Sequence, residues 1–167
     1  FSHQDPDVVS SLPLWQQISS RELSVSVSEI YADSISHLNA HTRLAIIPDT
    51  GDEISFGKSP ALRAVPAHYL YSPGNFHLYD PTAKILYTGK VGTAIIPPGQ
   101  NHGFIVEDFI DHVDYMSAFH QRWMPSKEAR NFWLHHISDI KIDTLVPHSG
   151  LIFQGNDVDR FLDWFSD

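Results

Sequence analysis

The chain contains no cysteine. This absence excludes disulfide bonds, thiolate metal ligands and thiol nucleophiles, and it suits a protein of the reducing cytoplasm. Positive charge is also scarce, since 11 Lys and Arg residues stand against 20 Asp and Glu residues and the formal net charge is −9. A field of this sign repels phosphate backbones and anionic lipids, so we expect neither nucleic acid nor a membrane as a partner.

Long apolar runs and common catalytic motifs are missing too. No stretch approaches the roughly 18 apolar residues of a membrane span, and no basic and apolar leader opens the chain, so we expect a cytoplasmic protein. The chain has no P-loop, no Gly-rich dinucleotide turn and no G-x-S-x-G elbow. Hydrophobic residues make up 42% of its 167 residues, which is enough for one packed core. We therefore expect a single domain over residues 1–167.

Short strands and amphipathic helices alternate along the chain. Strands are expected on both sides of a turn at Gly51, within residues 42–56, and at residues 62–68, 75–81, 84–89 and 142–150. Helices are expected at residues 10–18, 106–124, 126–140 and 157–165. Strands mixed with helices, and not segregated from them, favour a layered α/β fold.

The segment HQDPDV, residues 3–8, places one histidine and two carboxylates within five positions. Taken alone it is more often a polar turn, because Asp and Pro favour turns through local hydrogen bonds. Imidazole and carboxylate groups are also the ligands that non-haem iron and zinc accept in proteins. The segment therefore leaves two interpretations open.

Four stretches together resemble the diiron domain of flavodiiron proteins, which are oxygen and nitric oxide reductases, and of their flavin-free relatives, the oxygen-binding diiron proteins. HQDPDVVSSLP (3–13) resembles the family loop H-x-E-x-D-H, and VPAHYLYSPGNFHLYDPTAKILYTGKVG (65–92) resembles the stretch that follows with further ligands. FHQRWMPS (119–126) and VPHSGLIFQG (146–155) resemble the remainder. The resemblance implies a metallo-β-lactamase-type four-layer αβ/βα sandwich, here starting at the first ligand loop with its N-terminal part missing.

Position by position, the resemblance implies four metal ligands in the first two stretches. His3 stands at the first histidine, Asp5 at the glutamate and Asp7 at the aspartate of the loop. His68 matches another family histidine in the second stretch. One iron would take His3, Asp5 and His68, and two histidines with one carboxylate suit non-haem Fe(II), although zinc accepts the same set.

The second iron position has lost ligands. Val8 replaces a histidine, and Lys90 in YTGKVG replaces the bridging aspartate. A charged ammonium has no lone pair to offer a metal. His148 precedes by one residue the position of the last family histidine, which is Ser149, and neighbouring residues on an extended segment point to opposite faces. We expect His148 to be a weak ligand at most, and Lys90 to carry positive charge toward the vacated position and pair with Asp7.

These losses separate the functions that the resemblance implies. A flavodiiron reductase needs two irons and a flavin domain, and no flavin site is visible in this chain. A hydrolase of this fold uses the loop H-x-H-x-D-H, in which Asp5 and Val8 replace two histidines. The resemblance thus implies a domain that holds one or two iron ions and binds dioxygen or nitric oxide, or senses redox state. A metal-free scaffold or interaction domain, and a flavodiiron-type reductase lacking its flavin domain, are the alternatives.

The resemblance also implies partners. Members of the family pair head to tail, and the aromatic helices of this chain offer apolar surface, so a homodimer is expected. A sensing domain further needs a signalling or electron-donor protein as a partner.

Overall fold

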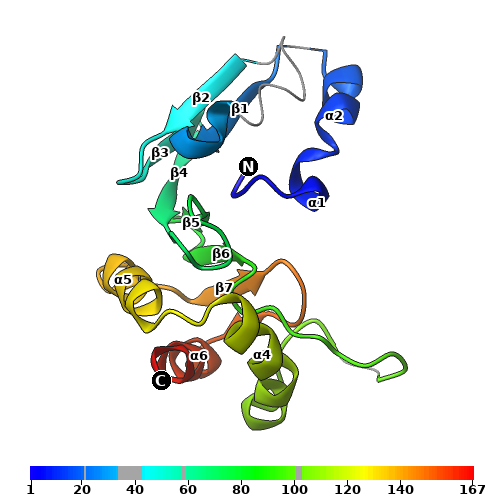
Figure 1. Ribbon diagram of the computed structural model, residues 1–167, viewed down its shortest axis with the longest axis vertical. Coiled ribbons are helices and arrows are strands. Elements are labelled where there is room, and N and C mark those ends of the chain that lie inside the picture. Colours follow the sequence, from blue (N-terminus) through cyan, green and yellow to red (C-terminus); the bar gives the residue numbers. More distant parts are fainter. Residues whose placement is uncertain (21, 34–42, 58, 101–102) are drawn as a thin grey trace.

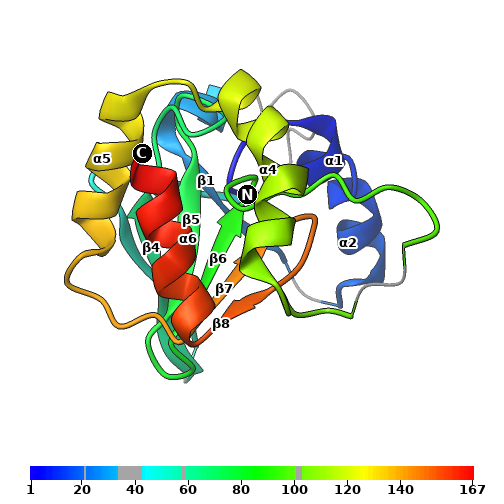
Figure 2. The ribbon, with the colours of Figure 1, turned by 90° about the horizontal axis from the view of Figure 1, so that it is seen from below.

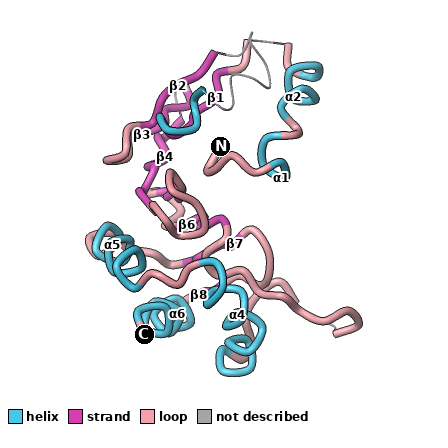
Figure 3. Tube along the Cα trace, viewed as in Figure 1, coloured by secondary structure: helices cyan, strands magenta, loops and turns pink. Residues whose placement is uncertain are grey.

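The structure is a computed structural model that describes residues 1–20, 22–33, 43–57, 59–100 and 103–167. Its helices are α1 (Pro6–Val9), α2 (Leu12–Ile18), the 3-10 helix η1 (Glu29–Tyr31), α4 (Phe109–Trp123), α5 (Lys127–Ile137) and α6 (Asn156–Ser166). Its strands are β1 (Ser24–Ser28), β2 (Arg43–Ile47), β3 (Asp52–Phe56), β4 (Ser59–Pro66), β5 (Phe76–Asp80), β6 (Ile85–Gly89), β7 (Thr144–Pro147) and β8 (Phe153–Gln154). Figure 3 distinguishes these helices and strands along the chain.

The strands form two sheets that lie between layers of helices. β1 and β2 pair in parallel, whereas the second sheet has six strands in the order β3-β4-β5-β6-β7-β8. All neighbours in the larger sheet are antiparallel except β6 and β7. Helices α4, α5 and α6 cover one face of this sheet, and the β1–β2 pair lies on its other side with α1 and α2 (Figures 1 and 2). The arrangement differs from a doubly wound parallel sheet and agrees with the expected layered sandwich.

The main core lies between the six-stranded sheet and its three covering helices. Trp133 of α5 and Phe161 of α6 are fully buried there, and the Phe161 ring packs on Phe153 of β8 at a centroid distance of 4.8 Å. Val158, Phe161 and Phe165 recur at helical spacing and form the buried face of α6. Each such side chain contributes about 1.5–3 kcal/mol through burial.

A smaller apolar cluster connects the two sheets. Ile47 at the end of β2 packs against Phe76 at the start of β5. The hydroxyl of Tyr31 accepts a hydrogen bond from the Gly74 N–H at 2.8 Å. A Cβ at Gly74 would lie only 2.5 Å from Ile30 Cγ1, so a larger residue there would displace the Ile30 side chain. The loop before β5 is therefore fixed against η1.

The predicted helices and strands are found, with ends shifted by a few residues. The two strands on either side of Gly51 belong to different sheets, because β2 pairs with β1 and β3 pairs with β4. Gly51 has φ of +82°, and a Cβ there would lie 2.3 Å from the carbonyl oxygen of Ala64. Strands β1 and β8 were not predicted. Within the described ranges, no helix is both long and apolar enough to cross a membrane.

Candidate functional site

The first ligand loop lies along the start of β5. The Phe76 N–H donates to the carbonyl oxygen of Ser2 at 3.2 Å, and the Ser2 hydroxyl is hydrogen-bonded to His3 Nδ1 at 2.8 Å. His3 is buried, and its Nε2 lies 3.7 Å from Asp5 Oδ2. Helix α1 begins directly after Asp5, where Pro6 suits the first helical position. These contacts bring two of the predicted ligands, His3 and Asp5, together.

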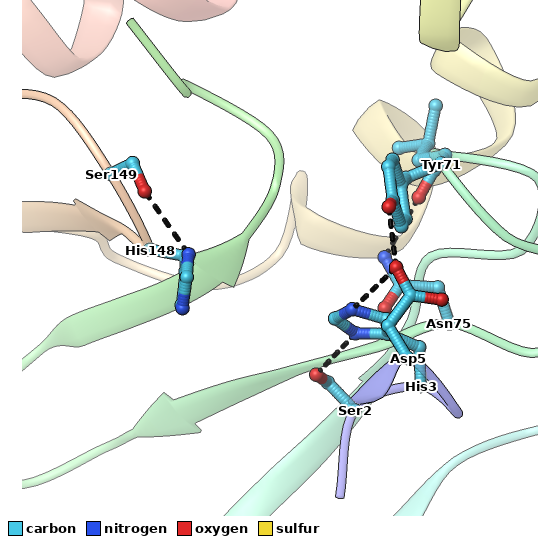
Figure 4. A network of polar contacts seen from close by, with 8 residues as sticks. Ser2, His3, Asp5, Tyr71, Asn75, His148 and Ser149 are labelled. Carbon is cyan, nitrogen blue, oxygen red and sulfur yellow. Dashed lines mark hydrogen bonds and ion pairs between the residues drawn. The ribbon is translucent and has the colours of Figure 1, made fainter. Parts of the chain in front are cut away.

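Asp5 occupies the N-cap position of α1, yet its side chain makes no capping hydrogen bond. Its carboxylate instead accepts a hydrogen bond from the hydroxyl of Tyr71 (Figure 4). The Tyr71 ring also meets the His3 ring edge-on at a centroid distance of 5.4 Å. Tyr71 was not among the predicted site residues, yet it contacts both His3 and Asp5.

The loop between β4 and β5 aims Tyr71 at Asp5. Tyr69 and Tyr71 have φ of +62° and +79°, values that bulky residues rarely adopt. Such strain costs about 1–3 kcal/mol per residue and persists only where surrounding contacts impose it. Here the Asn75 side-chain amide donates to the Leu70 carbonyl at 2.8 Å, and the Tyr69 N–H donates to the Ser72 carbonyl at 2.9 Å. These bonds hold the strained loop in place.

Lys90 and helix α4 complete the surroundings of Tyr71. Lys90 Nζ lies 5.4 Å from the centroid of the Tyr71 ring, a cation–π contact. On α4, the Phe119 ring stacks with Tyr71 at an interplanar angle of 11°, and the Trp123 ring lies 5.1 Å away between centroids. The cluster of His3, Asp5, Tyr71 and Lys90, which we call the polar cluster, is thus walled by aromatic rings.

The other predicted ligands do not join the polar cluster in the structure. His68 Nε2 donates to the Asp49 carbonyl at 2.8 Å, and its ring packs against Phe76 and Phe132. His148 is exposed, and its Nδ1 is 3.1 Å from the Ser149 hydroxyl, away from His3 and Asp5 (Figure 4).

Two further positions of the first loop carry no visible ligand. Val8 packs with the apolar cluster around Val9, Val27 and Tyr31. Asp7 lies in α1, and its side chain is outside the part that the structure describes. Among the described residues, no three His, Asp or Glu side chains converge in a way that could hold a metal ion.

This donor set does not fit an iron pair. Asp5 already accepts the Tyr71 hydroxyl, and Lys90 adds a positive charge that would repel an incoming cation. Neither the Lys90 ammonium nor the Val8 side chain can donate a lone pair. The geometry favours a hydrogen-bonded network made of protein groups alone.

His77 on β5 lies near His3 and interacts with it electrostatically. It is 1% exposed, and burial lowers the pKa of His77 to about 3, with a further lowering from the nearby His3. Its ring meets Trp133 edge-on at a centroid distance of 5.2 Å. His77 is therefore neutral and packs as a core residue, which agrees with its position on a strand.

The sequence pattern of one protein family, described as "ODP family beta lactamase", matches residues 1–150 of the chain. The chain belongs to the ODP family. No curated protein shows significant similarity to it. The match includes the first ligand loop, the Tyr71 loop and Lys90, so the whole polar cluster lies within the matched residues.

Solved structures agree with this assignment. The ODP-family chain is 32% identical to the "Peroxy diiron species of chemotaxis sensor ODP", with a TM-score of 0.86 over 99% of this chain and 68% of that one. It is 33% identical to the "Apo state of chemotaxis sensor ODP from T. denticola", with a TM-score of 0.89 over 99% and 67%. A variant of the flavo di-iron protein from Thermotoga maritima is 19% identical, with a TM-score of 0.80 over 99% and 41%, and shows the fold alone. The predicted metallo-β-lactamase-type fold is confirmed.

Proposed function

We propose that this ODP-family chain is a sensing or interaction domain that works without a bound metal, with residues 1–167 as one domain. The observation that carries the proposal is the hydrogen bond from Tyr71 to Asp5 beside the ammonium of Lys90. Two similar structures are of a chemotaxis sensor, which supports a sensing role for the fold. The network stands where the resemblance placed the metal ligands.

The energetics of the polar cluster oppose metal binding. A hydrogen bond to a charged group contributes about 1.5–3 kcal/mol, so a metal at Asp5 must first replace the bond from Tyr71. The ammonium of Lys90 beside Tyr71 also repels an incoming cation. Among the described side chains of the loop, His3 and Asp5 offer too few donors to offset both costs.

Metal analysis tests this function directly. The chain is expressed with added iron, purified without chelator and without oxygen, and analysed for iron and zinc. We expect far less than one metal ion per chain, and a melting curve that a chelator does not change. A variant with Lys90→Asp and Tyr71→His serves as the control, because it supplies a carboxylate and an imidazole beside His3 and Asp5 and should gain iron. One or two tightly bound iron ions in the wild-type chain would overturn the proposal.

A second candidate function is binding of dioxygen or nitric oxide at a single iron. The observation that favours it is the 3.7 Å approach of His3 Nε2 to Asp5 Oδ2, two groups that iron or zinc accepts. The predicted ligand set for this candidate is His3, Asp5, Asp7, His68 and His148. Stoichiometric iron with spectra that change on adding the gas would favour it over the metal-free function. Neither candidate places a flavin in this chain.

We further propose that the domain acts as a homodimer and contacts a signalling or electron-donor protein. Exposed apolar side chains on α2 support an interaction surface, since Leu14, Trp15 and Ile18 are 62%, 57% and 72% exposed. Light scattering at micromolar concentration measures the oligomeric state. A monomer under these conditions would contradict the dimer.

A further inference from the structure

We propose that a cavity between α4, α5 and α6 binds a small aromatic carboxylate, whose carboxylate group is held by Arg130. The inference goes beyond the proposed function, because it does not depend on whether the polar cluster holds a metal. The cavity has a volume of about 240 Å³, which is below the roughly 300–1,000 Å³ of sites for drug-sized ligands. A molecule with a single ring and one charged group suits this size.

The cavity lies where the second half of α4, the first turn of α5 and the last turn of α6 meet. Six residues of these helices line it: Ser117, His120, Gln121, Arg130, Trp164 and Phe165. By contrast, Phe119 and Trp123 of α4 contact Tyr71. Because residues three or four positions apart share a helix face, these two side chains lie on a different face of α4 from the cavity. The cavity is therefore separate from the polar cluster.

Arg130 is a half-buried cation without an acidic partner. In the ranges that the structure describes, no carboxylate lies within ion-pair distance of Arg130, whereas Arg160 of α6 pairs with Asp157 at 3.1 Å. Arg130 Nη1 donates to the Met124 carbonyl at 3.2 Å, and its buried Nε has no hydrogen-bond partner among the described residues. Buried charged groups are normally paired. An anion in the cavity would supply the missing partner.

The acidic groups nearest to Arg130 do not take this place. The Glu128 carboxylate accepts the hydroxyl of Ser126 at 3.1 Å, at the start of α5. Asp167 also lines the cavity, but it is exposed, and its charge opposes an anionic ligand. The chain as a whole carries a formal net charge of −9 and repels anions. Anion binding here must therefore come from Arg130 itself.

The aromatic walls of the cavity indicate the rest of the ligand. Arg130 Cζ lies 5.9 Å from the centroid of the Phe165 ring, a cation–π contact. The His120 ring meets the rings of Trp164 and Phe165 edge-on, at centroid distances of 5.2 and 5.7 Å. Such surfaces favour a flat ring that packs stacked or edge-on. A carboxylate on that ring matches the planar fork of a guanidinium, which can bind both oxygens.

His120 forms a neutral wall of the cavity. Its Nδ1 donates to the Met116 carbonyl and its Nε2 accepts the Gly92 N–H, so both ring nitrogens are engaged within the protein. Burial lowers the pKa of His120 to about 4, although the Met116 bond opposes this lowering, and the charge of Arg130 lowers it further. Arg130 is thus the cation among the lining residues at neutral pH.

A nuclear magnetic resonance titration at low ionic strength tests the inference, with benzoate as the probe. The chain has four tryptophans, and the indole N–H signal of Trp164 is identified by its loss in Trp164→Phe. We expect benzoate to shift this signal in a saturable way and to leave the signal of Trp15, on the distant α2, in place. Benzyl alcohol has the ring without the charge, and acetate has the charge without the ring. Both should bind about tenfold more weakly, or worse.

Two variants and a control examine the charge. Arg130→Met keeps an apolar stem and should weaken benzoate binding about tenfold or more, because the charge-assisted bonds are lost. Arg160→Met is the matched control, since it removes an exposed arginine of α6 outside the cavity and should bind as the wild type does. Asp167→Asn removes the opposing charge and should tighten binding. Circular dichroism checks that each variant is folded.

Three results would overturn the inference. The first is a wild-type chain in which benzoate shifts the Trp164 and Trp15 signals alike, or shifts neither. The second is benzyl alcohol or acetate binding as tightly as benzoate. The third is weaker binding of benzoate in Asp167→Asn, which would mark a cavity for cations. Because these comparisons use the wild type and a surface variant, they stand even where Arg130→Met does not fold.

Discussion

Acid should destabilise the domain through His120, a buried residue of α4. His120 Nδ1 donates to the Met116 carbonyl at 2.8 Å, and its Nε2 accepts the Gly92 N–H at 2.9 Å. The bond from Gly92 requires the neutral ring, because a protonated Nε2 cannot accept it. Burial lowers the pKa of His120 to about 4 from 6.5, although the bond to Met116 opposes this lowering. Between these two values the unfolded chain binds a proton that the folded chain does not, so stability falls as the pH falls. This lowering of the His120 pKa corresponds to about 3 kcal/mol of stability that is lost as the pH falls.

Urea denaturation of the wild type and of His120→Gln, from neutral pH down to about pH 4, measures this contribution. Glutamine offers a donor and an acceptor and does not titrate in this range. Carboxylates and His77 affect both proteins alike, so the stability difference between them isolates His120. We expect the advantage of the wild type to shrink by about 3 kcal/mol as the pH falls. Parallel curves for the two proteins would refute the assigned protonation state.

Other changes have defined outcomes. Tyr71→Phe removes the bond to Asp5 and should lower the free energy of unfolding in urea by about 1–3 kcal/mol. Gly74→Ala places a Cβ 2.5 Å from Ile30 Cγ1 and should lower the melting temperature, with a cost of about 1–3 kcal/mol. Trp133→Ala empties a fully buried position and should cost about 3–5 kcal/mol in the same urea assay. Lys90→Asp alone should raise the affinity for Fe(II), measured by titration, because it replaces a cation with a carboxylate.

Much of the fold was predictable because it rests on local patterns and on the resemblance. The buried face of α6 follows from the spacing of Val158, Phe161 and Phe165. Strand β1 was not predicted because its sequence, SVSVS, is short and alternates valine with serine. Val27 becomes buried only through tertiary contacts, which the local sequence does not reveal. The two-residue β8 is too short to have a period of its own.

The site was predictable only in part. The approach of His3 to Asp5 and the presence of Lys90 beside them followed from the order of the family loop. The roles of His68 and Tyr71 did not, because two tyrosines with positive φ reverse the loop between β4 and β5. Nothing in a tyrosine predicts a left-handed backbone, as glycine or asparagine would. The resemblance alone therefore did not indicate the hydrogen bond of Tyr71 to Asp5.

The missing side-chain cap on α1 has a mechanical consequence. An N-cap aspartate usually stabilises its helix by about 1 kcal/mol, but Asp5 directs its carboxylate to Tyr71 instead. A helix of four residues cannot persist by its own backbone bonds, so α1 depends on Asp5 at one end and on buried Val9 at the other. An N-cap carboxylate can accept either from an outside donor, here the Tyr71 hydroxyl, or from a backbone N–H of the first turn. A change that weakens the bond from Tyr71 therefore favours a capping bond from the α1 backbone to Asp5. The position and stability of α1 are thus coupled to the contacts of the polar cluster.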